Sequence, residues 1–167
     1  EGVYTLPFID EAPIECSFAC AAVALHLGVT REQLACRMEC LEPIAMRLEV
    51  KEGKNNCTLI NDSYNSDLAS LDIALNFMAR RSEEMGRKRT LILSDLLETG
   101  QSSKFLYRQV ADLVKTHGVD RIIGIGTEIS EASSRFEVEK HFFHTTEEFL
   151  ASDWLLNLRN EVVLIKG

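Results

Sequence analysis

The chain has 167 residues, 26% of them charged, and a formal net charge of −8 at pH 7. This length allows one domain with an appendage and a buried core. The negative charge argues against a surface that follows nucleic-acid phosphates. No apolar run is long enough to cross a membrane, so neither nucleic acid nor a membrane is expected as a partner.

The amino-terminal part of the chain predicts a short helical appendage. Residues 1–13 are expected to be extended, and residues 15–27 form an Ala- and Cys-rich helix that Gly28 closes. A capping box at Thr30 opens a second helix that ends near residue 41. We place the boundary after residues 1–43.

Four of the five cysteines form two pairs with helical spacing. Within each pair the residues are four apart, which puts them on one helix face. The pairs are Cys16 with Cys20 and Cys36 with Cys40. One interpretation is a four-thiolate zinc site. The other, which we favour, is that these cysteines are small core residues in a reducing cytosol, because zinc-binding pairs usually lie in tight turns.

From residue 44 onward, strand patterns alternate with helix patterns. The expected strands are 47–51, 57–61, 90–94, 121–125, 141–144 and 162–166, and the expected helices are 67–85, 103–117, 128–134 and 146–157. This alternation predicts an α/β fold, a Rossmann-like and mostly parallel sheet of about six strands flanked by helices. The polar run 51–56 indicates a hairpin, which makes the first strand pair antiparallel.

Asp62 is the leading candidate for a binding residue. It follows a buried strand, and ligands bind beyond the carboxyl ends of the strands in open α/β sheets. Asp62 could accept hydrogen bonds from ribose hydroxyls, or it could satisfy its own turn. Ser66, a few residues later, is expected to cap the following helix.

Two further loops leave the same sheet edge. Asp95 could either cap the loop backbone or touch a substrate. Gly124 and Gly126 form a Gly-x-Gly turn, which we interpret as a tight turn because a dinucleotide fingerprint needs a third glycine. His141 and His144 face opposite sides of a strand, which argues against a shared metal.

Four segments of this chain resemble, in order, motifs of the Mur ligases. The run from Leu59 to Asp67 resembles their Asp-x-Tyr-Asn-Ala-Asn signature. The other three are Pro43 to Val50, Leu93 to Gly100 and Val162 to Gly167. The resemblance implies an ATP-dependent enzyme of peptidoglycan synthesis. Residues 44–167 would be its carboxy-terminal domain, and residues 1–43 the tail of its central ATPase domain.

The resemblance also implies site residues. Arg47 would reach the nucleotide phosphates, although an arginine beside an apolar strand could simply extend to solvent. Asp62, Tyr64 and Asn65 would complete a nucleotide-binding set. Substrate contacts are expected from Asp95 and Glu98. No catalytic residue and no metal ligand is expected in this part of the enzyme.

Within the family, Ser63-Tyr64-Asn65 resembles the member that adds D-alanyl-D-alanine to UDP-N-acetylmuramoyl-tripeptide, with ATP and Mg²⁺ as cofactors. Asp67, Ser94 and Thr99 depart from the family pattern and indicate a divergent branch, such as one fused to an alanine racemase.

The sequence has no Gly-x-x-x-x-Gly-Lys-[Ser/Thr] loop, and it starts without an initiator methionine or a basic leader. We therefore expect a segment of a longer cytoplasmic enzyme. Alone, it should neither hydrolyse ATP nor bind ATP more tightly than the millimolar range.

Two other classes of protein remain as alternatives. A phospho-receiver domain would use Asp95 together with Lys166, but the acidic pair that such a domain needs after its first strand is missing. A nicotinamide-binding domain is disfavoured by the incomplete glycine fingerprint.

Overall fold

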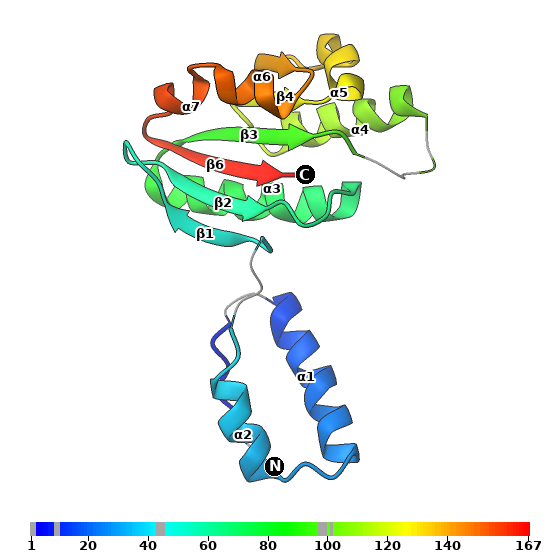
Figure 1. The fold of residues 1–167 in the computed structure, drawn as a ribbon, viewed down its shortest axis with the longest axis vertical. Coiled ribbons are helices and arrows are strands. Elements are labelled where there is room, and N and C mark those ends of the chain that lie inside the picture. Colours follow the sequence, from blue (N-terminus) through cyan, green and yellow to red (C-terminus); the bar gives the residue numbers. More distant parts are fainter. Residues whose placement is uncertain (1–2, 9–10, 43–45, 97–99, 101) are drawn as a thin grey trace. The chain divides into compact units, whose positions relative to one another are not determined.

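A computed structural model describes residues 3–8, 11–42, 46–96, 100 and 102–167 of the chain (Figure 1). Its contacts divide the chain into two compact units, Glu1–Ala45 and Met46–Gly167. This division lies next to the boundary expected after residue 43. No helix in the described ranges is long and apolar enough to cross a membrane.

The first unit is a pair of helices, α1 (Glu11–His26) and α2 (Arg31–Glu39). The capping box at Thr30 is confirmed. Helix α1 starts earlier than expected, because Pro13 lies in the first helical turn, where a missing N–H costs nothing. The helices pack through a small cluster of buried side chains, Ala21, Leu34 and Met38.

The second unit is built on a six-stranded sheet, as predicted. Its strands are β1 (Glu49–Glu52), β2 (Thr58–Asp62), β3 (Lys88–Ser94), β4 (Arg121–Ile125), β5 (Glu139–Phe143) and β6 (Glu161–Lys166). They lie in the order β1-β2-β6-β3-β4-β5. All neighbouring strands are parallel except β1 and β2, which form the predicted antiparallel hairpin. Asn55 and Asn56, with φ of +55° and +59°, form its tight turn.

Helices cover both faces of the sheet (Figure 1). They are α3 (Leu68–Met85), α4 (Ser103–Thr116), α5 (Thr127–Glu131), α6 (Thr146–Ala151), α7 (Trp154–Asn157) and the short 3₁₀ helix η1 (Ser133–Arg135). Because side chains alternate along a strand, Leu91 and Leu93 pack with Leu75 of α3 on one face. Ile92 packs with Phe149 of α6 on the other.

Two of the expected helices are each divided in the structure. The pattern over residues 128–134 becomes α5 followed by η1, and the pattern over 146–157 becomes α6 and α7. The second break occurs where the backbone becomes extended at Ser152, with φ −83° and ψ 159°. An apolar periodicity continues across such a break because both short helices still cover the same sheet face.

The cap of α3 corrects a prediction. Asp67, not Ser66, is the N-cap residue: its carboxylate accepts a hydrogen bond from the Ser70 N–H at 2.8 Å, and the Ser70 hydroxyl accepts one from the Asp67 N–H at 3.2 Å. Had Ser66 been the cap, the reciprocal position would fall on Ala69, whose side chain can neither donate nor accept. Gly86, with φ +61°, closes the helix.

Candidate functional site

The carboxyl edge of the sheet brings together residues that are far apart in the sequence. Asp62 is the last residue of β2 and is the register partner of Lys166, the last residue of β6. Since β1 runs antiparallel to β2, the start of β1 lies beside the end of β2. Arg47, just before β1, therefore reaches the same edge as Asp62, as the sequence predicted.

Asp62 is held by two contacts within the protein. Its Oδ2 lies 2.7 Å from Lys166 Nζ, and its Oδ1 accepts a hydrogen bond from the Leu48 N–H at 3.1 Å. The residue is only 7% exposed. The sequence left two roles for this carboxylate, to accept hydrogen bonds from ribose hydroxyls or to satisfy the backbone of its own turn. In the structure both oxygens are already engaged, which gives Asp62 the geometry of a positioning group.

Arg47 lies between two residues that have positive φ angles. Met46 and Leu48 have φ of +61° and +48°, in the left-handed region that side chains with a Cβ disfavour. The Arg47 guanidinium carbon lies 4.2 Å from the centroid of the Tyr64 ring, and Tyr64 is 62% exposed. No carboxylate in the described part of the chain lies within 4.0 Å of this guanidinium.

This stack leaves the donors of Arg47 available. A guanidinium that stacks on an aromatic ring uses its face, while its N–H groups point outward in the plane. Arg47 is exposed, so the planar fork can make a bidentate contact with a phosphate or a carboxylate. The phosphate role of Arg47 and the alternative, an arginine that extends into solvent, both stay predictions.

Asn65 lies next to this stack. Its carbonyl oxygen accepts a hydrogen bond from the Lys166 ammonium, and its side-chain amide lies 3.5 Å from Asp67 Oδ2. The hydrogen bond from the Ser70 N–H is the main cause that lowers the pKa of Asp67. Asn65 is exposed, so its side chain remains accessible for a ligand.

Of the two roles predicted for Asp95, capping the loop backbone or touching a substrate, the structure shows the backbone contacts. Its carboxylate accepts hydrogen bonds from the N–H groups of Glu128 and Ile129 at 3.2 and 2.8 Å, at the start of α5. It also accepts one from the Tyr107 hydroxyl at 3.1 Å, and burial raises the pKa of that hydroxyl. Asp95 therefore ties β3 to α4 and α5. Glu98 lies outside the described residues.

The Gly-x-Gly turn serves packing. A Cβ on Gly126 would lie 2.3 Å from the carboxyl carbon of Asp95, and one on Gly124 would lie 2.4 Å from the Phe142 ring. An aspartate thus fills the place where a dinucleotide phosphate would bind, which contradicts the nicotinamide alternative. The phospho-receiver alternative also fails, because Lys166 is paired with Asp62 and not with Asp95.

The cysteines correct another expectation. All four members of the two pairs are exposed, so they are not core residues in this chain, and only Cys57 is buried. The described residues contain no group of three or more His, Cys, Asp or Glu side chains that could hold a metal ion. The His141 ring lies against the Trp154 ring, with centroids 3.8 Å apart and planes tilted by 38°.

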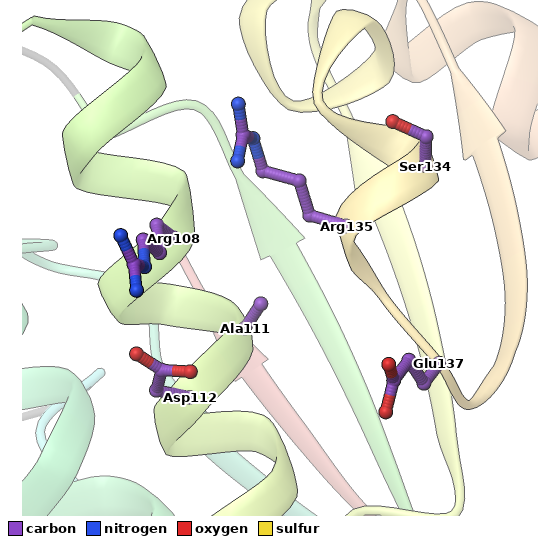
Figure 2. A pocket seen from close by; sticks show the side chains of 6 residues that line it. All are labelled: Arg108, Ala111, Asp112, Ser134, Arg135 and Glu137. Carbon is purple, nitrogen blue, oxygen red and sulfur yellow. The ribbon is translucent and has the colours of Figure 1, made fainter.

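A polar hollow of about 490 Å³ lies between α4 and the η1 segment (Figure 2). It is lined by Arg108, Ala111, Asp112, Ser134, Arg135 and Glu137. The lining mixes both charges, and Glu137 pairs with Lys115 at 3.1 Å. Because the hollow lies among helices that cover one sheet face, away from the strand ends that carry Arg47 and Asp62, we do not take it as the candidate site.

The profile of one protein family, described as "Mur ligase, glutamate ligase domain", matches residues 46–167. The chain belongs to the Mur ligase family. The matched range coincides with the second unit of the structure, which carries the whole sheet and its carboxyl edge.

Curated relatives from several bacteria share this similarity. The chain is 27% identical over 163 residues to the UDP-N-acetylmuramoyl-tripeptide–D-alanyl-D-alanine ligase of Escherichia coli strain K12, covering 97% of this chain and 35% of the relative. It is 29% identical over 171 residues to the ligase of the same name from Haemophilus influenzae, covering 98% and 36%. The chain thus spans about a third of the length of these Mur ligases.

Solved structures show the same fold. A crystal structure of MurF from Acinetobacter baumannii has a TM-score of 0.75 at 24% identity, covering 98% of this chain and 36% of that one. MurF ligase from Thermotoga maritima, in complex with ADP, has a TM-score of 0.63 at 19% identity, covering 87% and 32%. At these identities the likenesses show that the fold is shared.

Sequence reasoning did not place Lys166 in this site. Two signals pointed to it without assigning it a partner: the lysine ends the last strand, which suits the phospho-receiver alternative, and it lies in the segment Val162 to Gly167 that resembles a Mur ligase motif. Its pairing with Asp62 depends on β6 lying between β2 and β3, and no local pattern in the sequence determines that order.

Proposed function

We propose that this chain is the carboxy-terminal part of a longer, cytoplasmic, ATP-dependent ligase that joins D-alanyl-D-alanine to UDP-N-acetylmuramoyl-tripeptide. The names of the curated relatives and the family match support the reaction. The coverage of about a third of each relative supports a longer enzyme, in which residues 1–43 would end the central ATPase domain.

The reaction is acyl transfer in two stages. The terminal carboxylate of the tripeptide takes a phosphoryl group from ATP, and the amine of D-alanyl-D-alanine then displaces phosphate from the activated carbonyl. Most of the rate enhancement in such chemistry comes from positioning and from stabilising the charge that develops on the phosphoryl group. Mg²⁺ would supply part of that stabilisation, and its ligands are expected in the rest of the enzyme.

The share of this chain is to present Arg47 to the nucleotide. The observation that carries this proposal is the Arg47–Tyr64 contact, in which the guanidinium carbon lies over the ring, 4.2 Å from its centroid, and both residues are exposed at the carboxyl edge. A phosphate fits such a fork, so the site suits the nucleotide. Tyr64 and Asn65 would contact the nucleotide beside Arg47. Asp62 would act by holding the backbone next to Arg47 through the Leu48 N–H. Glu98 stays a predicted substrate contact.

The longer enzyme tests the reaction. Release of ADP should require both UDP-N-acetylmuramoyl-tripeptide and D-alanyl-D-alanine, and mass spectrometry should find the pentapeptide product. Turnover with a free amino acid in place of the dipeptide would assign the chain to another Mur ligase. The 167-residue chain alone should bind ATP no more tightly than the millimolar range. A micromolar Kd by calorimetry would contradict the proposal that most of the ATP site lies in the rest of the enzyme.

Arg47→Ala should lower kcat/KM for ATP about 10- to 100-fold, the loss expected for one charge-assisted hydrogen bond. Stability should change little, because the side chain is exposed. Arg81→Ala is the matched control, since Arg81 also stacks on an aromatic ring, 5.5 Å from the centroid of Phe77, but lies near the end of α3. Equal ATP kinetics in the two variants would remove the nucleotide role of Arg47.

A further inference from the structure

Lys166 is a buried ammonium group at the centre of the candidate site. Its side chain is 2% exposed, and it lies on β6, between β2 and β3. Burying a charge is unfavourable unless it is paired and hydrogen-bonded. Lys166 meets that requirement with Asp62 Oδ2, at 2.7 Å, and with the carbonyl oxygen of Asn65. The ammonium is inaccessible to a ligand, so any role it has must act through these two partners.

The two partners of Lys166 are bound to, or belong to, the segments that carry Arg47 and Tyr64. Through Asp62, the ammonium is connected to the Leu48 N–H, next to Arg47. Through the Asn65 carbonyl, it holds the segment that carries Tyr64. The two segments are also joined directly, because the Tyr64 N–H donates to the Met46 carbonyl oxygen at 3.4 Å.

The backbone around Arg47 needs such support. Left-handed conformations at residues with a Cβ persist only where the surroundings enforce them. Leu48 adopts one, at φ +48°, and its N–H is bound by the Asp62 carboxylate. With the ammonium removed, Asp62 would be a buried carboxylate without its counter-ion, and it would turn toward solvent. That rotation would weaken its hydrogen bond with the Leu48 N–H.

We propose that Lys166 is a positioning residue that, through its buried ion pair with Asp62 and its hydrogen bond to Asn65, sets Arg47 and Tyr64 in the stacked arrangement that receives the ATP phosphates. The ammonium touches neither nucleotide nor substrate. The part of the proposal that concerns ATP rests on the proposed function, whereas the part that concerns the stack does not.

Nuclear magnetic resonance on the 167-residue chain tests the stack without any enzyme assay. The ring current of Tyr64 should displace the side-chain resonances of Arg47, and Tyr64→Leu gives their unstacked positions. Lys166→Met should move the Arg47 resonances to those unstacked positions. Lys115→Met, which removes an exposed ammonium of a surface ion pair, should leave them unchanged. Unchanged Arg47 resonances in folded Lys166→Met protein would overturn the proposal.

A second variant covers the case in which Lys166→Met does not fold. Lys166→Met combined with Asp62→Asn removes both charges and leaves no buried charge unpaired, so we expect this variant to fold. The Arg47 resonances should still occupy the unstacked positions in this double variant, because the Asn65 carbonyl oxygen has lost its ammonium donor and a neutral amide at position 62 binds the Leu48 N–H more weakly than a carboxylate does. A stack that persists there would show that the ion pair serves folding alone, and it would also overturn the proposal.

Kinetics of the longer enzyme then test the nucleotide role by a double-mutant cycle. The folded Lys166 variant should lose about as much kcat/KM for ATP as Arg47→Ala, and combining it with Arg47→Ala should cost no further activity. A structural role without positioning would instead give multiplicative losses. A wild-type enzyme without ligase activity would refute the proposed function, while the resonances of Arg47 would still decide the role of Lys166.

Discussion

Glu161 anchors the amino edge of the sheet with a carboxylate that is 5% exposed. It accepts a hydrogen bond from the Thr90 hydroxyl at 2.5 Å, and both of its oxygens lie 2.9 Å from Nη1 of Arg121. Arg121 has a second acidic partner, because its Nε donates to Glu139 at 2.8 Å. The Glu139 side chain is 44% exposed. Arg121 therefore pairs with one buried carboxylate, that of Glu161, and with one exposed carboxylate, that of Glu139.

Glu161→Gln keeps the shape of the side chain and removes its charge. Breaking a buried ion pair from one side costs about 3–5 kcal/mol. Because Arg121 would keep its ion pair with Glu139, the expected loss in the free energy of unfolding lies at the lower end of this range, about 3 kcal/mol. For a chain of this size that loss corresponds to a decrease in Tm of about 6–12 °C. Glu139→Gln, at the same arginine, should cost less than about 1 kcal/mol because exposed pairs contribute little.

Urea unfolding at pH 7 measures both losses. Trp154 is the only tryptophan and lies in the second unit, with its ring 5.2 Å from the Arg121 guanidinium carbon, so its fluorescence reports on this unit. Far-ultraviolet circular dichroism gives an independent transition. The midpoint of Glu161→Gln should fall at an unchanged slope. Losses for the two variants within about 0.5 kcal/mol of each other would refute the argument that burial decides the strength of this pair.

Two further changes test local features. Asp67→Ala should lose about 1 kcal/mol of stability at pH 7. Since the folded pKa of Asp67 is lowered from 3.8, the part of this contribution that depends on the charge is present above pH 3.8 and is lost as the pH falls through the lowered value, so the difference between the urea curves of the two proteins should become smaller in acid. Gly126→Ala should destabilise by about 2–4 kcal/mol, because φ is +138° and the new methyl group would overlap the Asp95 carboxylate; a thermal scan that shows no decrease in Tm would contradict this.

Local patterns in the sequence were sufficient for most of the elements. Strand and helix periodicities depend on neighbours two to four residues away, and so do the capping box at Thr30 and the turn at Asn55 and Asn56. The location of Arg47 beside Asp62 was also predictable, since an antiparallel first pair brings the start of one strand to the end of the next. The wrong cap, Ser66 for Asp67, came from choosing between adjacent polar residues, whereas the exposed cysteines and the divided helices depend on packing that no local pattern contains.

The sequence by itself therefore determined the α/β alternation, the family resemblance and the edge of the sheet at which Arg47 and Asp62 lie. Only the tertiary structure decided which side chains meet there. The insertion of β6 between β2 and β3 brings Lys166 to Asp62, and the packing of α5 brings its N–H groups to Asp95. Both pairings join segments that are far apart in the chain. The physical reason is that strand order follows from how all the helices bury their apolar faces together, which no local window of residues contains.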